Sequence, residues 1–192
     1  MKSEKTKRLC LLSMFVAILV VMDITGIGFI RLPAISISII DIPVIIGAIV
    51  LGPLSGAILG GTFGCISMWE ATHASSISDI VFSPFISGDP ISSLIMALGA
   101  RILFGFMAGW IYQRLKKKSV NDYLATLIAT ISGLIIHNVA VISCLCFLFP
   151  DLNVPLKKII LSIVSISFAL KIVFAFVLSS AFAKTLSKTI KV

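Results

Sequence analysis

Apolar residues fill the chain in long runs, and polar or charged residues gather between these runs. A helix that crosses a bilayer needs roughly 20 residues of this kind. The runs therefore predict an all-α integral membrane protein with six transmembrane helices in a single domain, residues 1–192. The predicted spans are residues 9–30, 35–51, 53–70, 92–113, 123–148 and 156–183.

Small residues repeat every four positions in two of these spans. The third span carries a row of glycines, and the fourth carries a row that includes one arginine. At 3.6 residues per turn each row forms a stripe along one helix face, and such stripes allow helix backbones to approach closely in lipid. The rows are Gly52, Gly56, Gly60 and Gly64, and Ala97, Arg101, Gly105 and Gly109. The alternative reading of the first row is a glycine-rich turn and loop.

The start of the second span has a different period. Residues 35–39 alternate isoleucine with serine, and strict alternation is typical of extended backbone. Extended backbone at membrane depth is tolerated only where protein or a water-filled cavity satisfies its hydrogen bonds, and it is a pointer to a transport site. The alternative is one continuous helix from Leu32, kinked at Pro43.

Composition supports a membrane protein and excludes a separate soluble domain. The chain is 58% hydrophobic and 12% charged, with a mean hydropathy of +1.14, whereas soluble domains carry about 25% charged residues. The net charge of +8 comes largely from basic residues at the ends of the spans, so it does not indicate nucleic-acid binding.

These basic residues predict the orientation in the membrane. With six spans, eleven of them fall on the side of the two termini and three on the other side, which places both termini in the cytoplasm. An odd number of spans would separate the two basic termini, so four spans is the remaining alternative. The eleven are Lys2, Lys5, Lys7, Arg8, Arg114, Lys116, Lys117, Lys118, Lys184, Lys188 and Lys191.

No motif in the chain predicts catalysis. The chain contains no G-x-x-x-x-G-K-[ST] loop, no G-x-S-x-G elbow and no H-E-x-x-H pair. Cys144 and Cys146 have the wrong spacing for a metal or redox pair, and the two histidines are far apart. We therefore expect no enzyme activity, no catalytic residue, no metal and no cofactor. If ATP drives this protein, another subunit must hydrolyse it.

Two cations lie within predicted spans, Arg101 in the fourth and Lys171 in the sixth. An ionised side chain at mid-membrane costs about 2.5–3.5 kcal/mol on insertion scales. An anionic ligand would compensate these charges, and we expect both residues to bind substrate. The alternatives are snorkelling to the interface or pairing with Asp23, Glu70 or a helix C-terminus.

Other polar and aromatic residues are candidates for the same site. His137 and Asn138 lie within the fifth span, where they bind ligand or join helices by hydrogen bonds. Trp69 ends the third span as a pocket wall or an interface anchor. Phe82 lies in the longest loop, residues 71–91, which acts as a lid or as a passive connector.

Two sequence stretches resemble the substrate-binding (S) components of energy-coupling factor (ECF) transporters. The first is Ile35 to Gly47, with Asp41-Ile42-Pro43 at the start of span two. The second is the hairpin Leu51-Gly52-Pro53-Leu54-Ser55-Gly56. Residues 81–85 and 100–105 match more loosely, and length and topology agree over the whole chain.

This resemblance implies a multi-pass protein of the bacterial plasma membrane that binds a vitamin near the outer face. Loops one, three and five and spans four to six hold the ligand, so Ser36 and Ser38 of the first loop join the candidate site. The implied partners are a transmembrane coupling (T) subunit and two ATPase subunits. The family's docking motif is commonly A-x-x-x-A, and Ser13-x-x-x-Ala17 takes its place here.

The loop at residues 78–85 most resembles the pantothenate-type branch of the family. A cationic pocket from Arg101 or Lys171 suits the pantothenate carboxylate. Folate and riboflavin remain alternatives by the same mechanism. The rival hypotheses are a stand-alone proton-coupled secondary transporter that uses Asp23, Glu70 or His137, and an assembly protein without a ligand.

Overall fold

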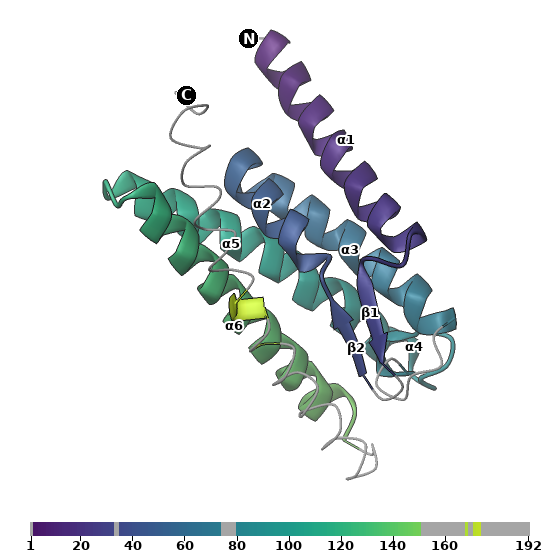
Figure 1. Ribbon diagram of the computed structural model, residues 1–192. Coiled ribbons are helices and arrows are strands. Elements are labelled where there is room, and N and C mark those ends of the chain that lie inside the picture. Colours follow the sequence, from purple (N-terminus) through teal and green to yellow (C-terminus); the bar gives the residue numbers. More distant parts are fainter. Residues whose placement is uncertain (1, 33–34, 74–79, 151–167, 169–170, 174–192) are drawn as a thin grey trace.

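The computed structural model describes residues 2–32, 35–73, 80–150, 168 and 171–173, and these are predominantly helical (Figure 1). Residues 2–73 contain helix α1, a two-stranded hairpin, and helices α2 and α3. Residues 80–148 contain a short 3₁₀ turn η1, helix α4, a π-helical turn η2, and helices α5 and α6. Their bounds are α1 Lys2–Ile24, β1 Phe29–Leu32, β2 Ile35–Ser38, α2 Asp41–Leu51, α3 Pro53–His73, η1 Ile80–Phe82, α4 Pro90–Leu94, η2 Ile95–Gly99, α5 Ala100–Lys117 and α6 Asp122–Leu148.

Helices α3 and α5 pack backbone to backbone along the two predicted stripes. A Cβ atom added at Gly56 would meet the carbonyl of Gly105, and one at Gly60 would meet the carbonyl of Arg101. A Cβ atom at Gly64 would lie 2.8 Å from the carbonyl oxygen of Ala97. As the glycine number falls from 64 to 60 to 56, the number of the residue it faces rises from 97 to 101 to 105. The helices are therefore antiparallel. The predicted close-packing face is confirmed for Gly56, Gly60 and Gly64, whereas Gly52 lies in the turn before α3 with a φ of +90°.

Helices α2, α3, α5 and α6 enclose the main core, and α1 lies beside α2 and α3 at its edge (Figure 1). The largest fully buried side chains include Phe63 of α3 and Phe104 of α5. Arg8 of α1 donates a hydrogen bond to the carbonyl of Leu51, the last residue of α2. This hydrogen bond connects the amino-terminal part of α1 to the bundle. The positive charge of Arg8 also stabilises the carboxyl end of α2, where the helix dipole is negative.

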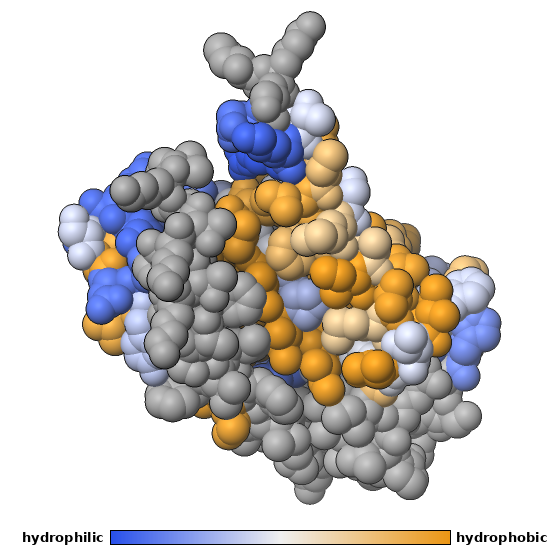
Figure 2. All heavy atoms as spheres, turned by 45° about the horizontal axis from the view of Figure 1, so that its top comes forward, coloured by the Kyte–Doolittle hydropathy of each residue, from blue (hydrophilic) through white to orange (hydrophobic). Residues whose placement is uncertain are grey.

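The outer surface of the bundle is largely apolar. Figure 2 shows apolar side chains over most of the coloured part of one face, with hydrophilic side chains toward its edges. A groove of about 460 Å³ between α1 and α2 is lined only by apolar residues, among them Met14, Ile18 and Ile46. Such a surface suits contact with lipid chains.

The first predicted span is too long. Helix α1 ends at Ile24 instead of Ile30, because the chain turns at Gly26, whose φ is +72°. A positive φ is readily adopted only by glycine, so the turn ends the helix where the hydrophobic run continues. A hydrophobic pattern cannot register this turn, since the residues after it remain apolar.

The chain then forms an antiparallel β-hairpin in the segment of alternating isoleucine and serine. Phe29 of β1 lies opposite Ser38 of β2. A strand therefore occupies Ile35–Ser38, and α2 begins only at Asp41. The alternative of one continuous helix from Leu32 is wrong. Helix α2 is correspondingly short, with 11 residues.

Within the described residues, two helical stretches are long and apolar enough to cross a membrane, Pro90–Lys117 and Asp122–Leu148. They correspond to the fourth and fifth predicted spans. The fourth begins at Pro90, two residues earlier than predicted, and includes the π-helical turn. The sixth predicted span, residues 156–183, lies almost entirely outside the described residues, so the count of six spans remains a prediction.

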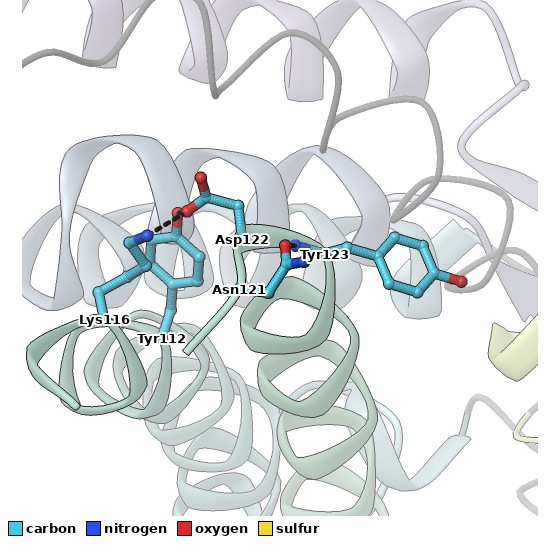
Figure 3. A network of polar contacts seen from close by, with 5 residues as sticks. All are labelled: Tyr112, Lys116, Asn121, Asp122 and Tyr123. Atoms are coloured by element: carbon cyan, nitrogen blue, oxygen red, sulfur yellow. Dashed lines mark hydrogen bonds and ion pairs between the residues drawn. The ribbon is translucent and has the colours of Figure 1, made fainter. Parts of the chain in front are cut away.

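Polar contacts fix the turn between α5 and α6 (Figure 3). Asp122 forms an ion pair with Lys116 and accepts a hydrogen bond from the Tyr112 hydroxyl at 3.4 Å. The side chain of Asn121 caps α6 by accepting a hydrogen bond from the Tyr123 backbone at 3.1 Å. These contacts connect the two helices at one end, while the candidate binding residues lie further along both of them.

Candidate binding site

Arg101 lies in the first turn of α5 and is buried, with 5% of its surface exposed. Its guanidinium group donates one hydrogen bond to the Ala97 carbonyl at 2.9 Å and another to Ser67 Oγ at 2.7 Å. Ala97 belongs to the π-helical turn η2, and such turns occur frequently at functional sites. The two bonds orient the guanidinium group from α3 on one side and from its own helix on the other.

Two aromatic rings flank the same guanidinium group. Its carbon Cζ lies 4.8 Å from the ring centre of Phe63 and 4.9 Å from that of Phe82. Cations are stabilised at this distance from aromatic faces. The structure thus brings two predicted site residues together, Arg101 of the fourth span and Phe82 of the long loop.

A network of hydroxyl groups holds the turn that carries Phe82. Ser93 of α4 donates a hydrogen bond to the Val81 carbonyl at 2.9 Å, and the hydroxyls of Ser83 and Thr72 lie 3.1 Å apart. Ser83 and Ser93 are fully buried. Sequence reasoning missed these serines, because serine in a loop is common and gives no local signal of burial.

A buried ion pair joins the start of α2 to the segment of the sixth predicted span. Lys171 pairs with Asp41, whose side chain is 1% exposed. Ser38 Oγ donates a hydrogen bond to the other oxygen of Asp41, at 3.3 Å. The alternative that Lys171 pairs within the protein therefore applies, although its partner is Asp41 and not one of the groups that the alternative named. Sequence reasoning missed Asp41, although an acidic residue in an apolar run was an available signal.

His137 of α6 lies among these groups. Its ring centre is 5.2 Å from that of Phe104 and 6.5 Å from that of Phe63. Arg101 contacts the same Phe63 ring, and the ion pair of Lys171 with Asp41 is near enough to influence the imidazole electrostatically, so these four residues form one polar cluster. The fold therefore brings Phe82 and His137 to the surroundings of Arg101 and Phe63, and it brings Lys171 and Ser38 together on Asp41.

Other candidates lie elsewhere or are described only in part. Trp69 is 64% exposed and stacks on His73, with ring centres 4.5 Å apart, so it is not brought to Arg101. Asn138 is half-buried beside His137 on α6, and Ser36 contributes backbone to β2. Ser13 and Ala17 are exposed on the outer face of α1.

The cluster has the chemistry of an anion-binding site with hydrogen-bonding groups around it. A guanidinium group presents five N–H donors in a fork that matches a carboxylate. Its burial strengthens any such pair, because the local dielectric is low. Among the described residues, no three His, Cys, Asp or Glu side chains lie together as a metal site would require.

Comparison with known proteins gives a consistent picture. Residues 7–190 match the family model described as "ECF transporter, substrate-specific component". The chain is 29% identical over 196 residues to the "Pantothenic acid transporter PanT" of Lactococcus lactis subsp. cremoris, covering 98% of this chain and 97% of that protein. It is 32% identical over 121 residues to the "Pantothenate transporter PanT" of Leuconostoc mesenteroides subsp. mesenteroides, covering 59% of this chain and 54% of that protein.

Proposed function

Because this chain belongs to the family of substrate-specific components of ECF transporters, we propose that it captures pantothenate as the vitamin-binding subunit of an ATP-driven uptake system. The family is one of membrane transport components and not of enzymes. The names of the two relatives support pantothenate over folate and riboflavin.

The observation that carries this proposal is the buried guanidinium group of Arg101. It is oriented by Ser67 and Ala97 and lies between the rings of Phe63 and Phe82. A single carboxylate, as in pantothenate, would form charge-assisted hydrogen bonds with it. The apolar rings would contact the methyl groups of the ligand and keep water away from the pair.

Transport would follow from the position of the site within the bundle. Ligand enters from the outer face, between the hairpin β1–β2 and the loop that carries Phe82, while both termini lie in the cytoplasm. The exposed stripe with Ser13 and Ala17 on α1 docks on the transmembrane coupling subunit. Two ATPase subunits then drive reorientation of the bundle and release of the vitamin inside.

Thermal unfolding of the detergent-purified protein against a panel of vitamins tests the proposal. A ligand at 100 times its dissociation constant adds about 2.7 kcal/mol to the free energy of unfolding. Pantothenate is expected to raise the unfolding temperature, and folate, riboflavin, thiamin and biotin are not. A shift with a different vitamin would contradict the choice of pantothenate, and a flat panel with folded protein would contradict vitamin capture.

A further inference from the structure

His137 carries a polar atom whose role the proposed function leaves open. Within the described part of the chain its Nδ1 is buried and has no hydrogen-bond partner, and the residue is only 7% exposed. Buried polar atoms are nearly always paired, so an unpaired one requires an explanation. A ligand atom that fills the site would supply the missing partner.

The neighbours of the ring define what kind of partner Nδ1 needs. The ring forms a hydrogen bond with the Ala100 backbone. Since Nδ1 has no partner, Nε2 is the nitrogen that makes this bond, and it donates its proton to the carbonyl. In a neutral imidazole the other nitrogen is then an acceptor. Nδ1 therefore needs a donor, such as a hydroxyl or an amide N–H.

Asp41 is a second buried acceptor in the polar cluster. An ionised carboxylate only accepts hydrogen bonds, and it has about four lone-pair positions. The Asp41 side chain is held by Ser38 and Lys171, and its charge acts on the His137 ring. Because Asp41 compensates Lys171, the charge of Lys171 serves to position Asp41.

The two chemical ends of the site are connected by one ring. Phe63 lies 4.8 Å from the Arg101 guanidinium carbon and 6.5 Å from the centre of the His137 ring. Arg101 thus presents donors on one side of Phe63, the unpaired acceptor of His137 lies near the same ring, and the ring supplies an apolar surface beside both groups.

We propose that this site recognises its ligand at two ends, with Arg101 binding a carboxylate and with His137 Nδ1 and Asp41 accepting hydrogen bonds from neutral donors at the other end. The inference rests on the proposed function and specifies it further. The substrate class is a monocarboxylate with hydroxyl or amide donors remote from the acid, and pantothenate has this form. Asp41 and His137 become specificity-determining residues, and the ligand has a fixed direction in the site.

Isothermal titration calorimetry of the purified full-length protein tests the donor end. The probes are pantothenate and an analogue in which both hydroxyl groups are replaced by hydrogen. The variant His137→Phe keeps an aromatic ring beside Phe63 and Phe104 but removes the acceptor. The matched control is His73→Phe, the same substitution at the exposed histidine that stacks on Trp69.

Wild type and His73→Phe are expected to prefer pantothenate over the deoxy analogue by about tenfold or more, because the analogue leaves Nδ1 unpaired. In His137→Phe this preference should fall to near one. Asp41→Asn alone would leave the Lys171 charge buried without its carboxylate, so Asp41→Asn is also combined with Lys171→Met. The double variant should likewise lose most of the preference.

The possible outcomes separate the two proposals. If wild type binds pantothenate and His137→Phe and the double variant keep the wild-type preference, the two-ended site is overturned and vitamin capture stands. An equal loss of affinity for both compounds would also overturn it, because a purely structural role lowers both alike. If wild type binds no pantothenate, the proposed function and this inference fail together.

Discussion

At the residue scale, Arg101 shows how a costly charge is accommodated. Its guanidinium group has hydrogen bonds to Ser67 and Ala97 and aromatic rings at Phe63 and Phe82. Sequence alone could single out Arg101, because a cation within an apolar run is visible locally. It could not identify Ser67 or the π-helical carbonyl of Ala97, because their contact with Arg101 depends on how α3 packs on α5.

Asp89 is a second residue whose role follows from its local contacts. It precedes α4 and accepts hydrogen bonds from the Ser92 backbone at 3.2 Å and the Ser92 hydroxyl at 2.6 Å. These bonds, the hydroxyl bond foremost, hold the pKa of Asp89 below its ordinary value of 3.8. The cap thereby supports the loop network that carries Phe82.

The Asp89→Ala variant should lose stability in a pH-dependent manner. A carboxyl group with a lowered pKa in the folded state stabilises the protein above its ordinary pKa, and this contribution disappears as pH falls through the folded-state pKa. The difference in unfolding temperature between wild type and variant should therefore be larger at about pH 6 than at about pH 2.5. A difference that is equal at both pH values would contradict this role of the charge.

At the element scale, the antiparallel contact of α3 with α5 determines the shape of the bundle. Its glycine spacing is a local property, so the sequence was sufficient to predict a close-packing face. The extended backbone of β2 was indicated by alternation, whereas the end of α1 at Ile24 and the π-helical turn were not. Those two features depend on single backbone angles and on tertiary contacts that a hydrophobic pattern does not record.

Adjacent glycines of α3 provide a matched test of this contact. A methyl group at Gly60 would collide with the backbone carbonyl of Arg101, whereas one at Gly61 would meet the Ile102 side chain at 3.6 Å, an ordinary contact. Gly60→Ala should lower the unfolding temperature in detergent and weaken ligand binding, because it displaces Arg101. Gly61→Ala should be neutral or stabilising by about 0.5–1 kcal/mol, since alanine favours helix.

The measured quantity is the difference in unfolding temperature between Gly60→Ala and Gly61→Ala. If Gly60→Ala were as stable as Gly61→Ala, the backbones of α3 and α5 could not be in contact at this level. Gly56, which faces Gly105, provides a second position at which the same collision is expected.

At the scale of the whole molecule, the site depends on contacts between residues far apart in the chain. Lys171 and Asp41 come from opposite ends of the sequence. Sequence reasoning selected Lys171 as a substrate-binding residue but did not identify Asp41 as its partner, because hydrophobic periodicity predicts helices and not their neighbours. Composition and motif resemblance nevertheless identified the family, since both are distributed along the whole chain.

The outer face of α1 is the surface we propose for docking on the coupling subunit. Ser13→Trp or Ala17→Trp should abolish ATP-driven uptake in vesicles with the complete transporter, because a bulky ring prevents close helix packing. Ligand binding by the isolated subunit should remain, since both residues are exposed on α1. Val139→Trp, at an exposed apolar position of α6, is the control and should retain uptake.

Loss of ligand binding in the α1 variants would mean that these positions stabilise the bundle instead of docking a partner. Uptake of pantothenate into vesicles without any ATPase would contradict the ATP-driven mechanism and would support a secondary transporter.

The measurement that tests the central claim most directly compares two ligands on two proteins. Calorimetry would determine the affinities of pantothenate and of an analogue whose carboxylate is replaced by a hydroxymethyl group, for wild type and for Arg101→Gln. Arg114→Gln is the matched control, since Arg114 lies on the same helix and is exposed beside Trp110. Wild type and Arg114→Gln should prefer the acid by about tenfold or more, and Arg101→Gln should show no preference. A preference for the acid that survives in Arg101→Gln would contradict the account, because the carboxylate would then bind elsewhere.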